Sequence, residues 1–279
     1  MATTAAILLN YNSSDYCIRC IAHLTKQSDT DLTIIVVDND STEDVSALER
    51  TCEDNSCVFI RSTVNGGYNA GNNVGLRYAA SAGCEYAMII NPDMEIRDRH
   101  YVRDAVAVMD SDPAIAVLGT DIIDMRGLHQ NPMREPTYLE ELCWPIELVK
   151  NRFRRQLYVE NPDESRYCHK VSGCCLFVRM SFIEAVGYFD EHVFLYCEEP
   201  ILAATVAREG MREYYCADLK AYHMHVESEK GDPVRRLGEY SKSRSYYLRT
   251  YGGYGPLALG LLMCSKRLQW AWYRSRRRG

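Results

Sequence analysis

The chain lacks both a leader-like start and a long apolar run. Its first residues, MATTAA, carry no basic segment followed by an apolar one, which is the pattern of a secretory signal peptide. No apolar stretch approaches the ~20 residues that a bilayer-spanning helix needs. We therefore expect a cytoplasmic protein that is not secreted by a signal peptide and does not span a membrane.

Two glycine-rich nucleotide motifs are also missing. A dehydrogenase-type Rossmann domain needs GxGxxG directly after its first strand, where this chain has Asn10, Tyr11 and Asn12. The later GGYNAG at 66–71 has the wrong spacing, and no phosphate-binding P-loop occurs. A nucleotide, if one is bound, must be held mainly by side chains at strand ends.

Positive charge is scarce outside the C-terminus. The net charge is −6, yet residues 265–279 hold six basic side chains and no acid, so the rest of the chain carries −12. A strongly acidic body disfavours nucleic acid as a partner. The basic tail is a separate feature.

Cysteine is plentiful, with 12 residues, but a disulfide framework is not expected in a chain without an export signal. Cys17 and Cys20 form a CxxC on an amphipathic pattern, and no second pair stands at zinc spacing. We predict that both pack in the core.

The 279 residues are 47% apolar and 25% charged, as in a globular protein with one large core or two small ones. Apolar runs of strand length alternate with helical patterns in the first half of the chain. This alternation predicts a parallel, right-handed α/β sheet. The expected strands, each followed by a polar or glycine-rich turn, cover 5–10, 32–37, 57–60 and the run from 86 that ends at 91.

The fourth of these strands ends in Asn91, Pro92 and Asp93. Pro92 cannot join a sheet ladder, so Asp93 is predicted at a carboxyl edge, where open α/β sheets bind ligands. A carboxylate there suits a divalent cation that carries phosphates. The alternative is an ordinary solvated turn aspartate.

The second half is less regular. A strand is expected over 115–119, a long functional loop with short helices over 125–170, a buried strand over 171–178 and a short helix over 181–186. Glu198 and Glu199 then follow an aromatic run. One of them with a raised pKa would make a general base, and both also suit the start of a helix over 200–209.

Two histidines follow a short strand pattern, and they would point the same way in an extended chain. His223 and His225 are both candidates to join Asp93 on a metal.

The tail combines an apolar run over 255–264 with aromatic and basic residues. Trp270, Trp272 and Tyr273 lie among six cations, which is typical of a segment at the surface of an anionic membrane. The alternative is a C-terminal helix that packs 257–263 on the core.

Seven stretches in order carry a resemblance over about residues 5–230. They are ILLNYN, IIVVDNDSTED, NGGYNAGNNVGLRYA, IINPD, VSGCCLFV, VGYFDEHVFLYCEE and YHMH. The chain resembles the family 2 inverting glycosyltransferases of the GT-A fold, in the rhamnosyltransferase-like branch of bacterial surface-polysaccharide enzymes.

The resemblance implies an α/β GT-A fold, with a Rossmann-like, mostly parallel central sheet flanked by helices. It divides the chain into a catalytic domain, 1–230, and a helical basic tail, 231–279. Within the domain, 1–118 would bind the nucleotide-sugar and 119–230 the acceptor. The donor would be a UDP- or dTDP-sugar, and the acceptor a glycan or polyprenyl-linked saccharide.

The resemblance also assigns residues. Asn12, Asp38 and Asn65 would meet the base and ribose, and Asp93 with His223, preferred over His225, would hold Mg²⁺ or Mn²⁺. Glu199, with Glu198 in reserve, would deprotonate the acceptor hydroxyl. The full set expected at the nucleotide-sugar is Asn10, Asn12, Asp38, Asn65, Gly67, Asn72, Asn91 and Asp93.

The acidic motif departs from the family pattern of ED, one residue, then DL. Glu198 stands for the Glu of this motif and Glu199 for its first Asp. Ile201 stands where the second Asp is expected, and Leu202 matches the Leu. A sugar-1-phosphate nucleotidyltransferase and a non-catalytic nucleotide-sugar-binding module remain as alternatives, although the first lacks its glycine-rich, lysine-bearing loop.

Overall fold

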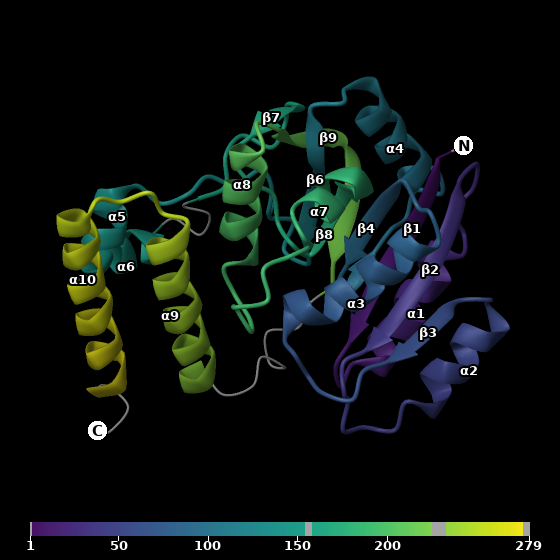
Figure 1. Ribbon diagram of the computed structural model, residues 1–279, viewed down its shortest axis with the longest axis horizontal. Coiled ribbons are helices and arrows are strands. Elements are labelled where there is room, and N and C mark those ends of the chain that lie inside the picture. The colour runs from purple at the N-terminus through teal and green to yellow at the C-terminus, as the bar shows by residue number, and fades with distance from the viewer. Residues whose placement is uncertain (1, 154–157, 225–232, 276–279) are drawn as a thin grey trace.

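The computed structural model describes residues 2–153, 158–224 and 233–275. It shows a central sheet covered by helices on both faces and a helical lobe beside it (Figure 1). The strands are β1 Thr3–Asn10, β2 Asp31–Asp38, β3 Val58–Arg61, β4 Tyr86–Ile90, β5 Met94–Glu95, β6 Ile115–Asp124, β7 Arg166–Cys168, β8 Cys175–Arg179 and β9 Arg212–His223. The helices are α1 Ser14–Leu24, α2 Ser46–Asp54, α3 Tyr68–Ser81, α4 Tyr101–Ser111, α5 Tyr138–Leu142, α6 Trp144–Phe153, α7 Met180–Ala185, α8 Glu198–Arg208, α9 Pro233–Thr250 and α10 Pro256–Ser275.

The first four predicted strands form one parallel block. Their order is β3-β2-β1-β4, and the register places Asn10 beside Asp38 at the end of β1 and β2. Because the strands are parallel, the polar turns after them meet at one edge of the sheet. The predicted parallel α/β arrangement is confirmed for this half.

The second half of the sheet is mixed, which the alternation of strands and helices does not predict. β8 runs antiparallel to both of its neighbours, β4 and β6, while β6 and β9 are parallel. β8 follows the long irregular segment instead of a crossover helix, so nothing in its connection requires a parallel direction. The sheet is therefore parallel in its first block and in the β6–β9 pair, and antiparallel where β8, β5 and β7 pair with their neighbours.

The short strand β5, which precedes α4, helps to build the site. α4 begins at Tyr101, and the residues between β4 and α4 include the short strand β5. β5 pairs antiparallel with the end of β9, which places Met94 opposite His223.

Two apolar layers cover the sheet, one on each face. Alternate residues of β1 point to opposite sides: Ala6 and Leu8 lie in the layer with α1, α2 and α4, and Ala5 and Ile7 in the layer with α3, α7 and α8. Cys17 is fully buried in the first of these layers, and so is Cys20, which confirms the core-packing prediction.

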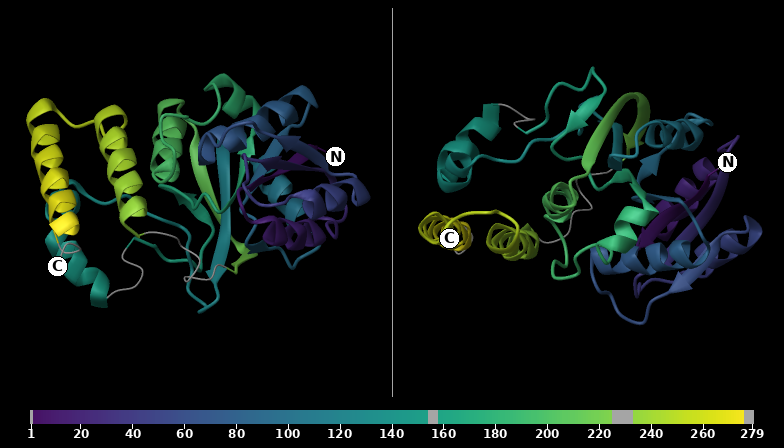
Figure 2. Two further views of the ribbon diagram at one scale, coloured as in Figure 1. Left: turned by 90° about the horizontal axis from the view of Figure 1, so that it is seen from below. Right: turned by 45° about the horizontal axis from the view of Figure 1, so that its top comes forward.

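The tail is part of a second lobe instead of a free segment. α9 and α10 lie side by side away from the sheet in every view (Figure 2), and α5 and α6 of the long loop lie with them. Tyr138 donates to the Ala258 carbonyl, and Ser265 Oγ donates to the Leu142 carbonyl at 2.7 Å. The division into an acceptor half at 119–230 and a separate tail stays a prediction, but residues from both ranges build this lobe.

A buried ionic cluster ties the lobe together. Glu141 of α5 accepts from Arg244 of α9 and pairs with Lys266 of α10, and Arg244 also pairs with Glu135. Lys170 Nζ lies 2.5 Å from Glu135 Oε2. Removing one partner of such a cluster leaves an uncompensated buried charge, so the cluster fixes the position of α9.

Candidate functional site

A cleft of about 620 Å³ opens at the carboxyl ends of β1, β2 and β4. The start of α9 closes it on the side of the helical lobe. The lining residues are Leu9, Tyr11, Asn12, Ser13, Tyr16, Asn39, Asn65, Gly67, Tyr68, Asn91, Pro92, Asp93, Phe194, Leu195, Arg235, Arg236 and Glu239. The cleft thus brings together five of the residues predicted at a nucleotide-sugar: Asn12, Asn65, Gly67, Asn91 and Asp93.

Asn10 and Asp38 lie beneath this cleft and do not line it. Both are fully buried. Asn10 Nδ2 donates to Asp38 Oδ1 at 2.9 Å and the Ser41 amide donates to Asp38 Oδ2 at 3.4 Å, so both carboxylate oxygens have partners inside the protein. They support the strand ends, and a direct contact of Asp38 with a base or ribose stays a prediction.

The two asparagines on the cleft wall organise its loops. Asn12 Oδ1 accepts from the Thr42 amide at 2.8 Å and so joins the turns after β1 and β2. Asn65 Oδ1 accepts from Asn39 Nδ2 and from the Gly67 amide, both at 3.0 Å. Each of these two side chains holds a loop in place, and both residues line the cleft.

Gly67 lies where two backbones meet. Its φ of +94° lies outside the range that other residues adopt readily, and a Cβ there would lie 2.3 Å from the Phe194 carbonyl oxygen. The next residue, Tyr68, donates its amide to that same carbonyl at 2.9 Å. Gly67 therefore allows the loop before α8 to form one wall of the cleft.

Gly67→Ala is expected to lower the free energy of unfolding by at least 1–3 kcal/mol, roughly the cost of a strained backbone region. Gly83→Ala is the matched control, because Gly83 has φ +73° with nothing within 4 Å of the added Cβ. Urea unfolding of both variants separates strain from the clash with Phe194. Equal losses in the two variants would contradict the close approach.

Asp93 and His223 meet across the β5–β9 pair. His223 Nε2 lies 3.1 Å from Asp93 Oδ2, and the Met224 amide donates to the Asp93 carbonyl at 2.8 Å. Gln130 Oε1 lies 3.1 Å from His223 Nδ1; an Nδ1–H donated to it would leave Nε2 as the lone-pair nitrogen. His225 lies outside the described residues.

This pair fits a divalent ion that is shared with a phosphate ligand. A carboxylate oxygen and an imidazole nitrogen both suit Mn²⁺, and the carboxylate suits Mg²⁺. Within the described ranges, no group of three or more His, Cys, Asp or Glu could hold a metal alone. The remaining ligands would have to come from the bound substrate and water.

Glu198 and Glu199 form the first turn of α8, two residues earlier than the predicted start at 200. The turn before them is strained, since Tyr196 and Cys197 have φ of +72° and +67°. Strain of this kind concentrates at functional sites. The prediction that the acids open a helix is confirmed.

The two carboxylates have different surroundings. Burial, followed by the negative charge of Glu199, raises the pKa of Glu198 to about 8. Glu198 Oε1 is buried without a hydrogen-bond partner among the described residues, whereas Glu199 Oε1 accepts from the Gly173 amide at 3.3 Å. Burial therefore favours the protonated form of Glu198.

Tyr68 separates the acids from the cleft. Glu198 and Glu199 line a small cavity of about 20 Å³ together with Tyr68, which also lines the large cleft. The Tyr68 hydroxyl lies 2.8 Å from the Gly173 carbonyl and 3.2 Å from Asn91 Oδ1. Asn72 lies behind it, buried, with its amide donating to the Tyr68 carbonyl at 3.0 Å, and does not line the cleft.

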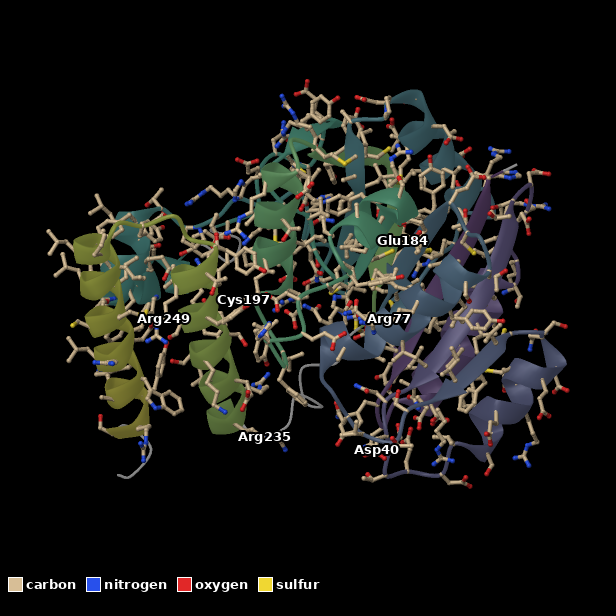
Figure 3. All side chains as sticks on the ribbon, in the orientation of Figure 1. Asp40, Arg77, Glu184, Cys197, Arg235 and Arg249 are labelled. Carbon is tan, nitrogen blue, oxygen red and sulfur yellow. The ribbon has the colours of Figure 1, made fainter. Side chains whose placement is uncertain are left out.

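Several lining residues were not predicted from the sequence. Asn39 follows Asp38 directly in a polar turn, so its position at a strand end was a usable signal. Arg235 and Arg236 had none, because they reach the cleft only through the packing of α9. Figure 3 shows Arg235 at the start of that helix, at the same edge of the molecule as Asp40 in the loop after β2.

An α/β sheet with a polar cleft at its parallel strand ends, next to a paired carboxylate and imidazole, defines a nucleotide-binding type of architecture. The family model of glycosyl transferase family 2 matches residues 5–186, so the chain belongs to that family. Among the described residues, no helix is long and apolar enough to cross a membrane.

Two relatives illustrate the similarity. The low-salt glycan biosynthesis hexosyltransferase Agl10 of Haloferax volcanii is 27% identical over 78% of this chain and 66% of its own length. An N-acetylglucosaminyl-diphospho-decaprenol L-rhamnosyltransferase of Mycobacterium tuberculosis is 30% identical over 38% of this chain and 33% of its own. The chain spans less than two thirds of either relative.

A solved structure supports the fold. The mannosyltransferase PcManGT from Pyrobaculum calidifontis, in complex with GDP-Man and Mn²⁺, superposes with a TM-score of 0.60 at 16% identity, over 94% of this chain and 68% of that one. The GT-A fold is thereby confirmed.

Proposed function

We propose that this protein is an inverting glycosyltransferase that moves a sugar from a nucleotide-sugar to a hydroxyl of a glycan or polyprenyl-linked acceptor in surface polysaccharide synthesis. The observation that carries the proposal is the convergence of Asp93 and His223 on one wall of the cleft, with a carboxylate pair at the start of α8 beyond Tyr68. The site gives no support to the two alternatives, a sugar-1-phosphate nucleotidyltransferase and a non-catalytic nucleotide-sugar-binding module.

The protein's own groups supply positioning and proton transfer. Glu199 would take the proton of the acceptor hydroxyl as that oxygen attacks the anomeric carbon from the face opposite the diphosphate. The bond to the diphosphate breaks as the new glycosidic bond forms, so the configuration inverts. A neutral Glu198 beside it adds no competing charge.

Asp93 and His223 would hold Mg²⁺ or Mn²⁺ together with the diphosphate. When bound, the ion supplies positive charge that stabilises the departing diphosphate. Asn12 and Asn65 would offer their side-chain amide groups to the base and ribose. Tyr11, which is 46% exposed and lines the same cleft, offers a ring face for stacking.

The donor is proposed to be a UDP- or dTDP-sugar, and the hexosyl and rhamnosyl relatives support a hexose or deoxyhexose. The decaprenol-linked substrate named for one relative supports a lipid-linked acceptor. Thermal stabilisation by a panel of UDP-, dTDP- and GDP-sugars with Mn²⁺ tests the proposal. One nucleotide class should raise the melting temperature, and stabilisation by none of them would overturn the function.

We also propose that α10 attaches the protein to an anionic membrane surface, but not by the predicted aromatic residues. Trp272 packs on Trp144, with ring centroids 5.3 Å apart, and Lys266 pairs with buried Glu141. The face that remains open is an apolar stripe at 4- and 3-residue spacings beside two exposed arginines. It comprises Leu257, Leu261, Cys264 and Leu268, with Arg267 and Arg274.

Replacing Leu257, Leu261 and Leu268 together by Ser should abolish sedimentation with anionic liposomes. The three leucines are 87%, 58% and 67% exposed, so the fold should not change. Val64→Ser, 67% exposed in the loop after β3, is the control. Salt should weaken binding of the unaltered chain, since each cation contributes about 1 kcal/mol near such a surface. Equal sedimentation of all forms would refute the attachment.

A further inference from the structure

The cleft has a positive wall that belongs to the C-terminal lobe. Arg235 and Arg236, in the first turn of α9, line it together with Glu239 of the next turn. Across the described ranges, no other lysine or arginine lines this cleft. The matched family model ends at residue 186, so these arginines lie outside it.

The charge on this wall is only partly compensated. Glu239 Oε1 accepts from Lys242 Nζ at 2.9 Å, so that carboxylate already has a cationic partner. Arg236 Nε is buried and has no hydrogen-bond partner in the part of the chain that the structure describes. A buried guanidinium nitrogen without an acceptor is costly, and an anionic ligand in the cleft would remove that cost.

α9 is held firmly enough to present these side chains. Ser243 Oγ donates to the Leu195 carbonyl at 2.7 Å, which fixes the helix to the loop that lines the same cleft. The next residue, Arg244, is locked into the ionic cluster with Glu135 and Glu141. Two neighbouring residues, Ser243 and Arg244, therefore hold α9 and the arginines at its start in place.

We propose that Arg235 and Arg236 form an anion subsite for the diphosphate of the donor, supplied by the C-terminal lobe to the cleft of the α/β domain. Arginine suits this task because its planar fork donates several hydrogen bonds to phosphate oxygens. The subsite rests on the proposed function. It makes the C-terminal helices part of the donor site and gives the leaving group charge compensation besides any metal ion.

The test measures binding by calorimetry, without turnover. Unaltered protein, Arg235→Gln, Arg236→Gln and the double variant are titrated with UDP, dTDP, uridine and inorganic diphosphate, each with Mn²⁺. Arg249→Gln is the matched control, since Arg249 is exposed at the opposite end of the same helix (Figure 3). Each cleft substitution should weaken nucleoside diphosphate binding about tenfold or more, while uridine binding and the control should not change.

The outcomes separate the subsite from the proposed function. Equal nucleoside diphosphate affinity in the double variant and the unaltered protein would overturn the subsite and leave the function standing. If the unaltered protein binds inorganic diphosphate but no nucleotide, and the double variant loses this diphosphate binding, the result would support the subsite and count against the proposed function. Equal losses for uridine and UDP would show a general distortion of the cleft and overturn the diphosphate assignment.

Discussion

Glu199→Gln is expected to lower turnover by about two to four orders of magnitude, the usual contribution of a general base, with donor affinity nearly unchanged. Glu199 occupies the position of the family aspartate and lies in the first turn of α8. The Gly173 amide donates to its Oε1 at 3.3 Å, which fixes the orientation of the carboxylate. Single-turnover rates and donor titrations measure the two quantities separately.

Glu198→Gln is the matched control, and it should retain most of the activity. Burial raises the pKa of Glu198 to about 8, so we expect this residue to be neutral at pH 7, and Gln reproduces its uncharged form. If Glu198→Gln is inactive and Glu199→Gln is active, the assignment of the base is wrong.

The raised pKa of Glu198 also predicts how the stability of the protein depends on pH, and Glu198→Gln tests this dependence. A folded-state pKa of about 8 against an ordinary 4.5 means that the native state binds more protons than the unfolded state between these values. Stability should therefore fall as pH rises from about 5 to 8. Glu198→Gln should flatten that fall in thermal melts, and an unchanged slope would show that Glu198 does not titrate there.

Asp93→Ala is expected to abolish metal-dependent nucleotide binding while the fold is retained. The carboxylate lies 3.1 Å from His223 Nε2 on the cleft wall, and its loss leaves the imidazole as the sole protein ligand of that pair. A single nitrogen ligand does not retain a hard divalent cation against water. Calorimetry with UDP or dTDP, with and without Mn²⁺, measures the effect.

Glu239→Gln is the control for this experiment, because it neutralises a second carboxylate that lines the same cleft. Its Mn²⁺ dependence should match that of the unaltered protein. An Asp93→Ala variant whose Mn²⁺-dependent affinity is unchanged would exclude Asp93 as a metal and diphosphate ligand.

The sequence by itself determined the parallel half of the sheet and the edge at which the cleft opens. Apolar runs that end in polar residues mark buried strands locally, and parallel strands bring their ends together. The positions of Asn12, Asn65, Gly67 and Asp93 at this edge follow from that rule. Glu198 and Glu199 at a helix start were also readable, because acids and a first-turn proline are a local signal.

Only the tertiary structure decided what depends on distant packing. The direction of β8 is set by its neighbours β4 and β6, and the burial of Asp38 follows from its partner Asn10. Arg236 reaches the cleft only because a buried ionic cluster fixes α9 beside it. Local patterns report a residue's own strand or helix, whereas such placements arise from the free energy of contacts between segments far apart in the chain.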